Sequence, residues 1–128
     1  MRKFTTSRVR SFGHAFQGWW YVLRTQRNAW LHVGIALAVF GLSFWLELDV
    51  FRWAVIVLTT ALVLAAEFFN TALEVVVDLV SPQEHPLAKV GKDVAAAAVL
   101  LTALAAVFIG ILILGPPFLL KLESMMTR

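Results

Sequence analysis

Three long stretches of this chain are almost entirely apolar, and short polar segments separate them. The apolar stretches cover residues 30–46, 53–80 and 94–114. Each approaches or exceeds the length of about 20 apolar residues that an α-helix needs to cross a bilayer. The segment "SPQEHP", residues 81–86, should end the second helix with its two prolines. The pattern therefore predicts three transmembrane helices at these positions.

Two expectations concern the borders of the third helix. Residues 87–93 contain two lysines and an aspartate, and we expect them to form a polar turn before the helix begins. At the other border, Gly115, Pro116 and Pro117 should end the helix, because proline removes a helical hydrogen bond and clashes with the preceding turn. Residues 118–128 would then form a frayed tail.

The N-terminal segment, residues 4–24, has the pattern of an amphipathic helix. One face would gather Phe12, Phe16, Trp19, Trp20 and Leu23, and the opposite face is basic and polar. Such an opposition of aromatic and basic faces is typical of a helix that lies in the membrane interface. A helix packed on protein is the alternative that the pattern leaves open.

Composition supports an all-α integral membrane protein with one domain over residues 1–128. Hydrophobic residues make up 60% of the chain, and the mean hydropathy is +0.81. A soluble domain of this length is mostly surface and cannot bury so much apolar area. The chain has no cysteine, which excludes disulfide and thiol chemistry. No basic run is interleaved with aromatic residues on a soluble domain, so we expect no nucleic-acid partner.

The distribution of basic residues predicts the orientation in the membrane. Eight of the 11 lysines and arginines lie in residues 1–29 and 81–93, and the other three lie on the opposite side of the predicted spans. Cytoplasmic loops carry an excess of lysine and arginine. The N-terminus and the 81–93 loop are therefore predicted to be cytoplasmic.

Polar residues interrupt the second apolar stretch at "EFFNTALEVVVD", residues 67–78. On a helix they fall within an arc of roughly 100°, and they are Glu67, Asn70, Thr71, Glu74 and Asp78. We call this set the acid stripe. A carboxylate that faced lipid would be costly, so the stripe should face a bundle interior or a wet crevice.

The acid stripe needs protons or a divalent cation, because its carboxylates repel one another. Carboxylate and amide oxygens suit Mg²⁺. Lys92 and Asp93, at the cytoplasmic start of the third helix, could lie beside the stripe and complete a phosphoryl-transfer site. Glu67 is the deepest and most shielded acid, which suits a general base, whereas Glu74 is nearer to water and suits a metal ion.

Other interpretations of the same residues remain open at this point. The acids could form the proton or cation path of a small transporter, which would need neither Lys92 and Asp93 nor ATP. The chain could also be a membrane scaffold without chemistry. Asp78 and Glu84 could simply be solvated near the interface. His32 would cap or line the start of the first span, and we assign it no role. No P-loop and no soluble-kinase signature occurs.

Three segments resemble the prokaryotic diacylglycerol kinase family, which includes undecaprenol kinase. They are "EFFNTALEVVVD" (67–78), "HPLAKVGKDVAAAAVL" (85–100) and "TQRNAWLH" (25–32). The resemblance extends over roughly residues 8 to 112. It implies a homotrimeric enzyme of the bacterial cytoplasmic membrane with an N-terminal surface helix. Such an enzyme transfers the γ-phosphate of ATP to a lipid hydroxyl with Mg²⁺, at sites that neighbouring subunits share near the cytoplasmic surface.

The resemblance also implies roles for individual residues. Glu67 resembles the general base that takes the proton of the lipid hydroxyl. Glu74 resembles a metal ligand, and Asn70 a polar partner that orients the site. The remaining matched positions resemble ATP contacts, namely Lys92, Asp93, Gln83, Glu84, His85 and one of Arg8 and Arg10.

Gln26 departs from the family pattern. Family members carry a glutamate at this position as a second metal ligand, and Gln26 keeps an acceptor oxygen without the charge. A neutral ligand should hold Mg²⁺ more weakly. The sequence does not separate diacylglycerol from undecaprenol as the acceptor, although residues 85–100 lean mildly toward the undecaprenol type.

Overall fold

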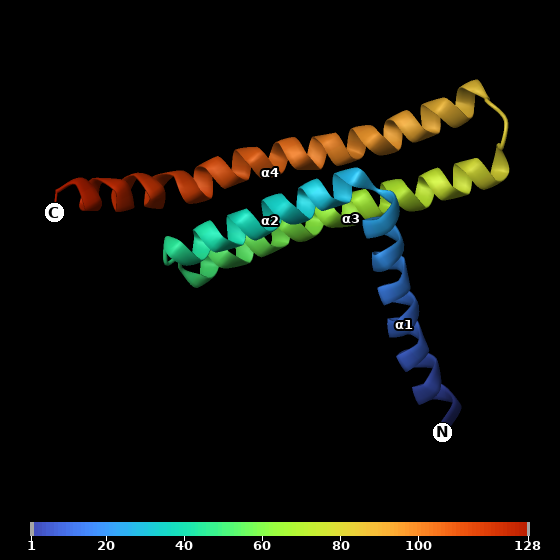
Figure 1. The fold of residues 1–128 in the computed structure, drawn as a ribbon, viewed down its shortest axis with the longest axis horizontal. Helices are drawn as coiled ribbons and strands as arrows, with labels where there is room; N and C mark the ends of the chain where they lie inside the picture. Colours follow the sequence, from blue (N-terminus) through green and yellow to red (C-terminus); the bar gives the residue numbers. More distant parts are fainter. Residues whose placement is uncertain (1, 128) are drawn as a thin grey trace.

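The computed structural model describes the backbone of residues 2–127 and the side chains of residues 10–127. The described chain is helical almost throughout, as the hydrophobic pattern predicts. Its helices are α1 (Arg2–Thr25), α2 (Arg27–Trp45), α3 (Val50–Val80) and α4 (Pro86–Met126). α2, α3 and α4 run alongside one another, and α1 leaves this bundle at a steep angle (Figure 1). α4 packs mainly against α3.

Three helices, α2, α3 and α4, are long and apolar enough to cross a bilayer, as predicted. Most of their large apolar side chains are exposed in the single chain, which is the surface that lipid or a partner helix would cover. α1 also exposes aromatic side chains, among them Phe12 and Phe16. The Trp19 ring of α1 packs against Phe68 of α3, with 5.2 Å between the ring centroids. The position of α1 in the membrane interface stays a prediction.

The expected polar turn at residues 87–93 is wrong, because these residues form the first turns of α4. Pro86 occupies the first turn, where its fixed φ suits a helix and its missing N–H would have no helical partner. The side chain of His85 accepts a hydrogen bond from the Leu87 backbone N–H at 3.2 Å and so caps the helix. Lys92 and Asp93 are therefore held on a helix rather than in a loop.

The expected frayed tail is also wrong, since α4 continues through Pro116 and Pro117 to Met126. The two prolines lack the N–H groups that would pair with carbonyls four residues earlier, but their φ is compatible with a helix. Contacts with the α2–α3 turn hold the segment beyond them. The Phe118 ring lies 6.3 Å from the Trp45 ring, and the Lys121 ammonium lies 2.8 Å from the Glu47 carboxylate.

The cluster of buried apolar side chains and most of the buried polar side chains lie in different parts of the bundle. The apolar core lies beside the α2–α3 turn, where Leu46, Leu48 and Ile56 are buried and Ile113 and Leu114 of α4 pack against them. Buried polar side chains of α3 lie further along that helix, toward the end that leads into α4. The apolar core thus joins the three helices beside the α2–α3 turn, and the buried polar residues of α3 lie nearer to the other end of the bundle.

The Lys121–Glu47 ion pair gives a pH-dependent contribution to stability. The Lys121 ammonium lowers the pKa of the Glu47 carboxyl below its ordinary value of 4.5, through its hydrogen bond and its charge. A lowered pKa in the folded state stabilises the fold fully above the ordinary pKa, and this gain is lost as the pH falls through the lowered pKa. We therefore expect Glu47→Gln to lower the melting temperature slightly at pH 7, with the difference disappearing under acidic conditions.

The measurement is thermal unfolding in detergent micelles over a pH series. Glu47 has a φ of 55°, a backbone conformation that favours glycine. Gln is a suitable replacement because it keeps the side-chain length and leaves the backbone strain at this position unchanged. Lys121→Met and the double variant complete a mutant cycle that isolates the pair. A difference between Glu47→Gln and the parent chain that does not change with pH would contradict the assignment.

Candidate active site

The acid stripe faces the interior of the bundle at its first three positions. Glu67 is 1% exposed, Asn70 8% and Thr71 2%, which confirms the prediction for these residues. Glu74, one turn further along α3, is partly buried, whereas 63% of the Asp78 side chain is exposed. α3 therefore carries its stripe from a dry interior at Glu67 to solvent at Asp78.

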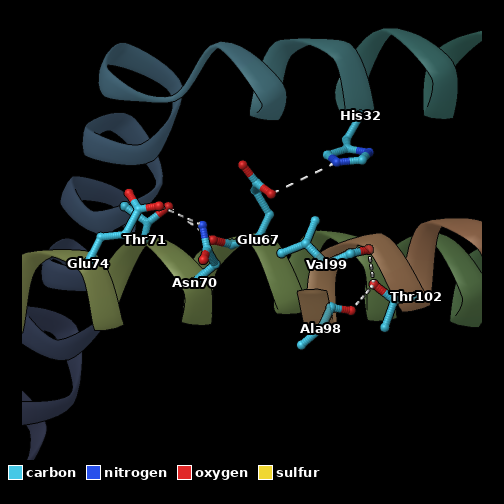
Figure 2. Close-up of polar contacts among 8 residues, drawn as sticks. All are labelled: His32, Glu67, Asn70, Thr71, Glu74, Ala98, Val99 and Thr102. Atoms are coloured by element: carbon cyan, nitrogen blue, oxygen red, sulfur yellow. Dashed lines mark hydrogen bonds and ion pairs between the residues drawn. The ribbon is translucent and has the colours of Figure 1, made fainter. Parts of the chain in front are cut away.

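The Glu74 carboxylate accepts hydrogen bonds on both of its oxygens. The Asn70 side-chain amide donates to Oε1 at 3.1 Å, and the Gln26 side-chain amide donates to Oε2 at 2.9 Å (Figure 2 shows the contact with Asn70). Gln26 is the residue at which α1 ends and α2 begins, and its backbone is extended. This break directs the Gln26 side chain toward α3. The structure thus brings together Gln26 and Glu74, which were predicted as a metal-binding pair.

The donor atoms of this cluster fit a hard divalent cation. Its members offer a carboxylate from Glu74 and amide oxygens from Gln26 and Asn70, and the Asn70 Oδ1 atom is buried without a hydrogen-bond partner. Among the described residues, no group of three or more His, Asp and Glu side chains could hold a metal ion. One carboxylate and two amide oxygens leave positions around an ion for waters or phosphate oxygens, which an ion of the Mg²⁺ type keeps.

Glu67 contacts a histidine to which the sequence assigned no role. Figure 2 shows the Glu67 carboxylate extending from α3 toward His32 of α2, and the distance from Oε2 to His32 Nε2 is 3.9 Å. The Thr71 hydroxyl donates to the backbone carbonyl of Glu67 at 2.9 Å, so this polar residue is satisfied by its own helix. The signal in the sequence was a histidine inside an otherwise apolar span.

A cavity of about 760 Å³ lies where α3 ends and α4 begins. Five of the residues predicted to contact ATP line it, namely Gln83, Glu84, His85, Lys92 and Asp93. Asp78 and Lys89 also line this cavity, although neither was predicted as an ATP contact. We call it the polar cavity. Asp78 is one turn from Glu74, a rise of about 6 Å along α3, so the polar cavity adjoins the acid stripe.

The charged residues of the polar cavity form ion pairs. Lys92 of α4 pairs with Asp78 of α3 across the two helices. Lys89 pairs with Asp93 along α4, with 2.7 Å between Nζ and Oδ2. Three of these side chains are largely exposed and that of Lys92 is 39% exposed, and exposed ion pairs contribute little to stability. A ligand can therefore replace these pairs at low cost.

Among the described residues, Asn70 and Arg10 do not line the polar cavity. Asn70, which was predicted to orient the site, belongs instead to the Glu74 cluster. Arg10 is exposed on α1, and the lining residues of the cavity come from α3, α4 and their connection. The side chain of Arg8 lies outside the described residues. The roles of Arg8 and Arg10 as ATP contacts stay predictions.

A second cavity, of about 680 Å³, is lined almost entirely by apolar side chains of α2, α3 and α4. His32 lines it together with residues such as Ile35, Val63 and Ala106. We call it the apolar groove. Because His32 belongs both to this groove and to the Glu67 contact, the groove adjoins the buried end of the acid stripe.

The chain is similar to known proteins over most of its length. The family described as prokaryotic diacylglycerol kinase matches residues 13–114. The undecaprenol kinase of Bacillus subtilis (strain 168) is 42% identical over 107 residues, which cover 84% of this chain and 87% of that protein. A diacylglycerol kinase of Synechocystis sp. is 47% identical over 110 residues, and these span 63% of its own length and 85% of this chain. The diacylglycerol kinase of Escherichia coli (strain K12) is 28% identical over 118 residues.

The contact between Gln26 and Glu74 predicts how a charge at position 26 would act. In Gln26→Glu, a second carboxylate replaces the amide donor beside Glu74, so the two groups should repel and lower the melting temperature when a chelator removes divalent cations. Mg²⁺ should reverse the loss, because a ligand at about one hundred times its dissociation constant stabilises the folded state by about 2.7 kcal/mol. The measurement is thermal unfolding with chelator and with excess Mg²⁺.

Gln17→Glu is the matched control, since Gln17 is an exposed glutamine of α1. Its melting temperature should respond to Mg²⁺ as the parent chain does. If Mg²⁺ shifts Gln26→Glu no more than this control, the cluster is not a cation site.

Proposed function

The chain belongs to the prokaryotic diacylglycerol kinase family and is a lipid kinase, and we propose that it transfers the γ-phosphate of ATP to a lipid hydroxyl at the cytoplasmic surface of a bacterial membrane. The observation that carries the proposal is the polar cavity, where residues matched to ATP contacts meet Asp78, the exposed end of the acid stripe. The excess of basic residues in residues 1–29 and 81–93 supports a cytoplasmic position for this end of the bundle.

ATP would bind in the polar cavity with a divalent cation. The cavity contains three carboxylates, from Asp78, Glu84 and Asp93, and two ammonium groups, from Lys89 and Lys92. These groups carry one more negative than positive charge, so the cavity would repel a triphosphate that arrived without a cation. A cation that accompanies the phosphates removes this repulsion, and Lys92 can then exchange Asp78 for a phosphate oxygen.

We propose Mg²⁺ as that cation, held by Glu74 with the amide oxygens of Gln26 and Asn70. Both amides donate to Glu74 in the absence of the ion, and a half-turn of either side chain presents its oxygen instead. Bound Mg²⁺ would neutralise charge on the transferring phosphoryl group. Because Gln26 is neutral, the protein supplies one carboxylate to the ion, and the phosphates of ATP supply the rest of its negative ligands.

Glu67 is the proposed general base. It would take the proton of the lipid hydroxyl while the acceptor oxygen forms a bond to the γ-phosphorus. The bond between the γ-phosphorus and the oxygen that bridges to the β-phosphate breaks in the same step, and ADP leaves. The burial of Glu67 keeps water from this position, which favours transfer to the lipid over hydrolysis of ATP.

The acceptor would arrive from the membrane along the apolar groove. That groove can accommodate a hydrocarbon chain. His32 forms the polar end of the groove and lies beside Glu67. Relatives that carry the names undecaprenol kinase and diacylglycerol kinase match the chain at similar identity. Both lipids are therefore candidate acceptors.

We further propose that the chain works as a homotrimer whose subunits share active sites. Large apolar side chains remain exposed along all three long helices, and partner helices would cover part of this surface. Arg10 of α1, which lies away from the polar cavity, would then reach a neighbouring subunit's site.

The direct test of the function is transfer of labelled phosphate from ATP in mixed micelles with Mg²⁺. Diacylglycerol and undecaprenol are offered separately. We expect labelled lipid in at least one reaction, and the ratio between the two identifies the preferred acceptor. Folded protein that labels neither lipid would contradict the proposal.

Glu67→Gln should abolish turnover and leave ATP affinity nearly unchanged, because Gln keeps the shape and loses the base. Loss of a general base typically costs about 10²- to 10⁴-fold in rate. The measurements are kcat in the micelle assay and the dissociation constant of ATP by calorimetry.

Glu123→Gln is the control, since Glu123 is exposed near the far end of α4. It should leave both values unchanged. A collapse of ATP affinity in Glu67→Gln would mean that Glu67 serves the nucleotide rather than the acceptor.

A further inference from the structure

The Glu67 carboxylate poses a problem that its own helix does not solve. It is almost completely buried, and the nearby carboxylate on the same helix, Glu74, repels it. An ionised carboxylate at such depth is costly without a partner of opposite charge or a hydrogen-bond donor. A base in this position therefore needs support from another helix.

His32 of α2 is positioned to give that support. Its Nε2 lies 3.9 Å from Glu67 Oε2, and its side chain is 14% exposed. This separation is within the range of an ion pair and beyond that of a hydrogen bond. Catalytic hydrogen bonds are often long in a ligand-free enzyme and shorten when the substrate is bound. Figure 2 shows the two side chains extending toward each other across the space between α2 and α3.

His32 also stands at the junction of two environments. It lines the apolar groove, which otherwise presents mostly aliphatic side chains. Its ring therefore borders both the space available to a lipid chain and the Glu67 carboxylate. A hydrogen-bond donor at the position of His32 can determine which carboxylate oxygen of Glu67 faces the hydroxyl of the lipid.

We infer that His32 is a positioning residue that donates from Nε2 to Glu67 and holds its carboxylate toward the lipid hydroxyl. The inference rests on the proposed role of Glu67 as the base. His32 itself exchanges no proton with the substrate in this arrangement. It acts by fixing the orientation of Glu67 and by offsetting the cost of burying its charge.

The test compares two substitutions that separate the donor from the ring. His32→Phe keeps an aromatic ring and removes the donor, whereas His32→Gln keeps a donor nitrogen at nearly the position of Nε2. We expect His32→Phe to lower kcat roughly 10- to 100-fold, because a misplaced catalytic group costs about that much. The KM for ATP should stay close to that of the parent chain, since the polar cavity is untouched. His32→Gln should recover most of the lost rate.

His14→Leu is the matched control, because His14 is an exposed histidine on α1. It should leave kcat unchanged. ATP affinity reports whether each variant is folded, and His32→Leu replaces His32→Phe if the latter loses that affinity.

The outcomes separate this inference from the function on which it rests. A parent chain that transfers phosphate to neither lipid overturns both. An active parent chain with normal kcat in His32→Phe overturns the positioning role and leaves the kinase intact. Equal losses in His32→Phe and His32→Gln would also overturn it, since a donor at that place would then have no effect. Loss in His32→Phe with recovery in His32→Gln supports it.

Discussion

Burial of a carboxylate inside a helix built to contact lipid is the constraint on which the rest of this structure depends. Glu67 lies on α3 with apolar side chains around most of the helix, and its exposure is negligible. The cost of such burial is large enough that neighbouring helices must supply polar partners. His32 of α2 approaches Glu67 itself, and Gln26 and Asn70 donate to Glu74, the next acid along the stripe. The polar residues nearest to Glu67 therefore come from two helices and from the break before α2.

The acid stripe of α3 runs from an apolar environment at one end to an aqueous one at the other. At the buried end of the acid stripe, Glu67 adjoins the apolar groove through His32. At the exposed end, Asp78 belongs to the polar cavity with Lys92. Glu74 lies between them and is reached by Gln26 from the break between α1 and α2. A hydrocarbon substrate and a highly charged one can thus approach the same few residues without either leaving its preferred solvent.

Much of this arrangement could be predicted from the sequence because helical periodicity determines which residues share a face. The three long helices and the inward direction of Glu67, Asn70 and Thr71 follow from that rule. Contacts between helices do not follow from it. The pairing of His32 with Glu67 depends on how α2 lies against α3, and a lone histidine in an apolar span gives no partner.

The errors at the borders of α4 have a related cause. Prolines and lysines predicted breaks at residues 87–93 and after residue 114, and local propensity was the only guide there. The contact of Lys121 with Glu47 supplied stabilisation that local sequence does not reveal, whereas the His85 cap is a local signal that the prediction missed. Family membership, rather than periodicity, decided between a kinase and a transporter, since both would place acids on the inner face of a membrane helix.

The break at Gln26 gives α1 a mechanical connection to the site. Gln26 belongs to neither helix, yet its side chain bonds the Glu74 carboxylate. Because Gln26 follows directly on the last turn of α1, a change in the angle of α1 to the bundle would displace this amide group at Glu74. If α1 lies in the membrane interface, as its sequence predicts, the thickness and curvature of the bilayer would then affect the geometry of the site.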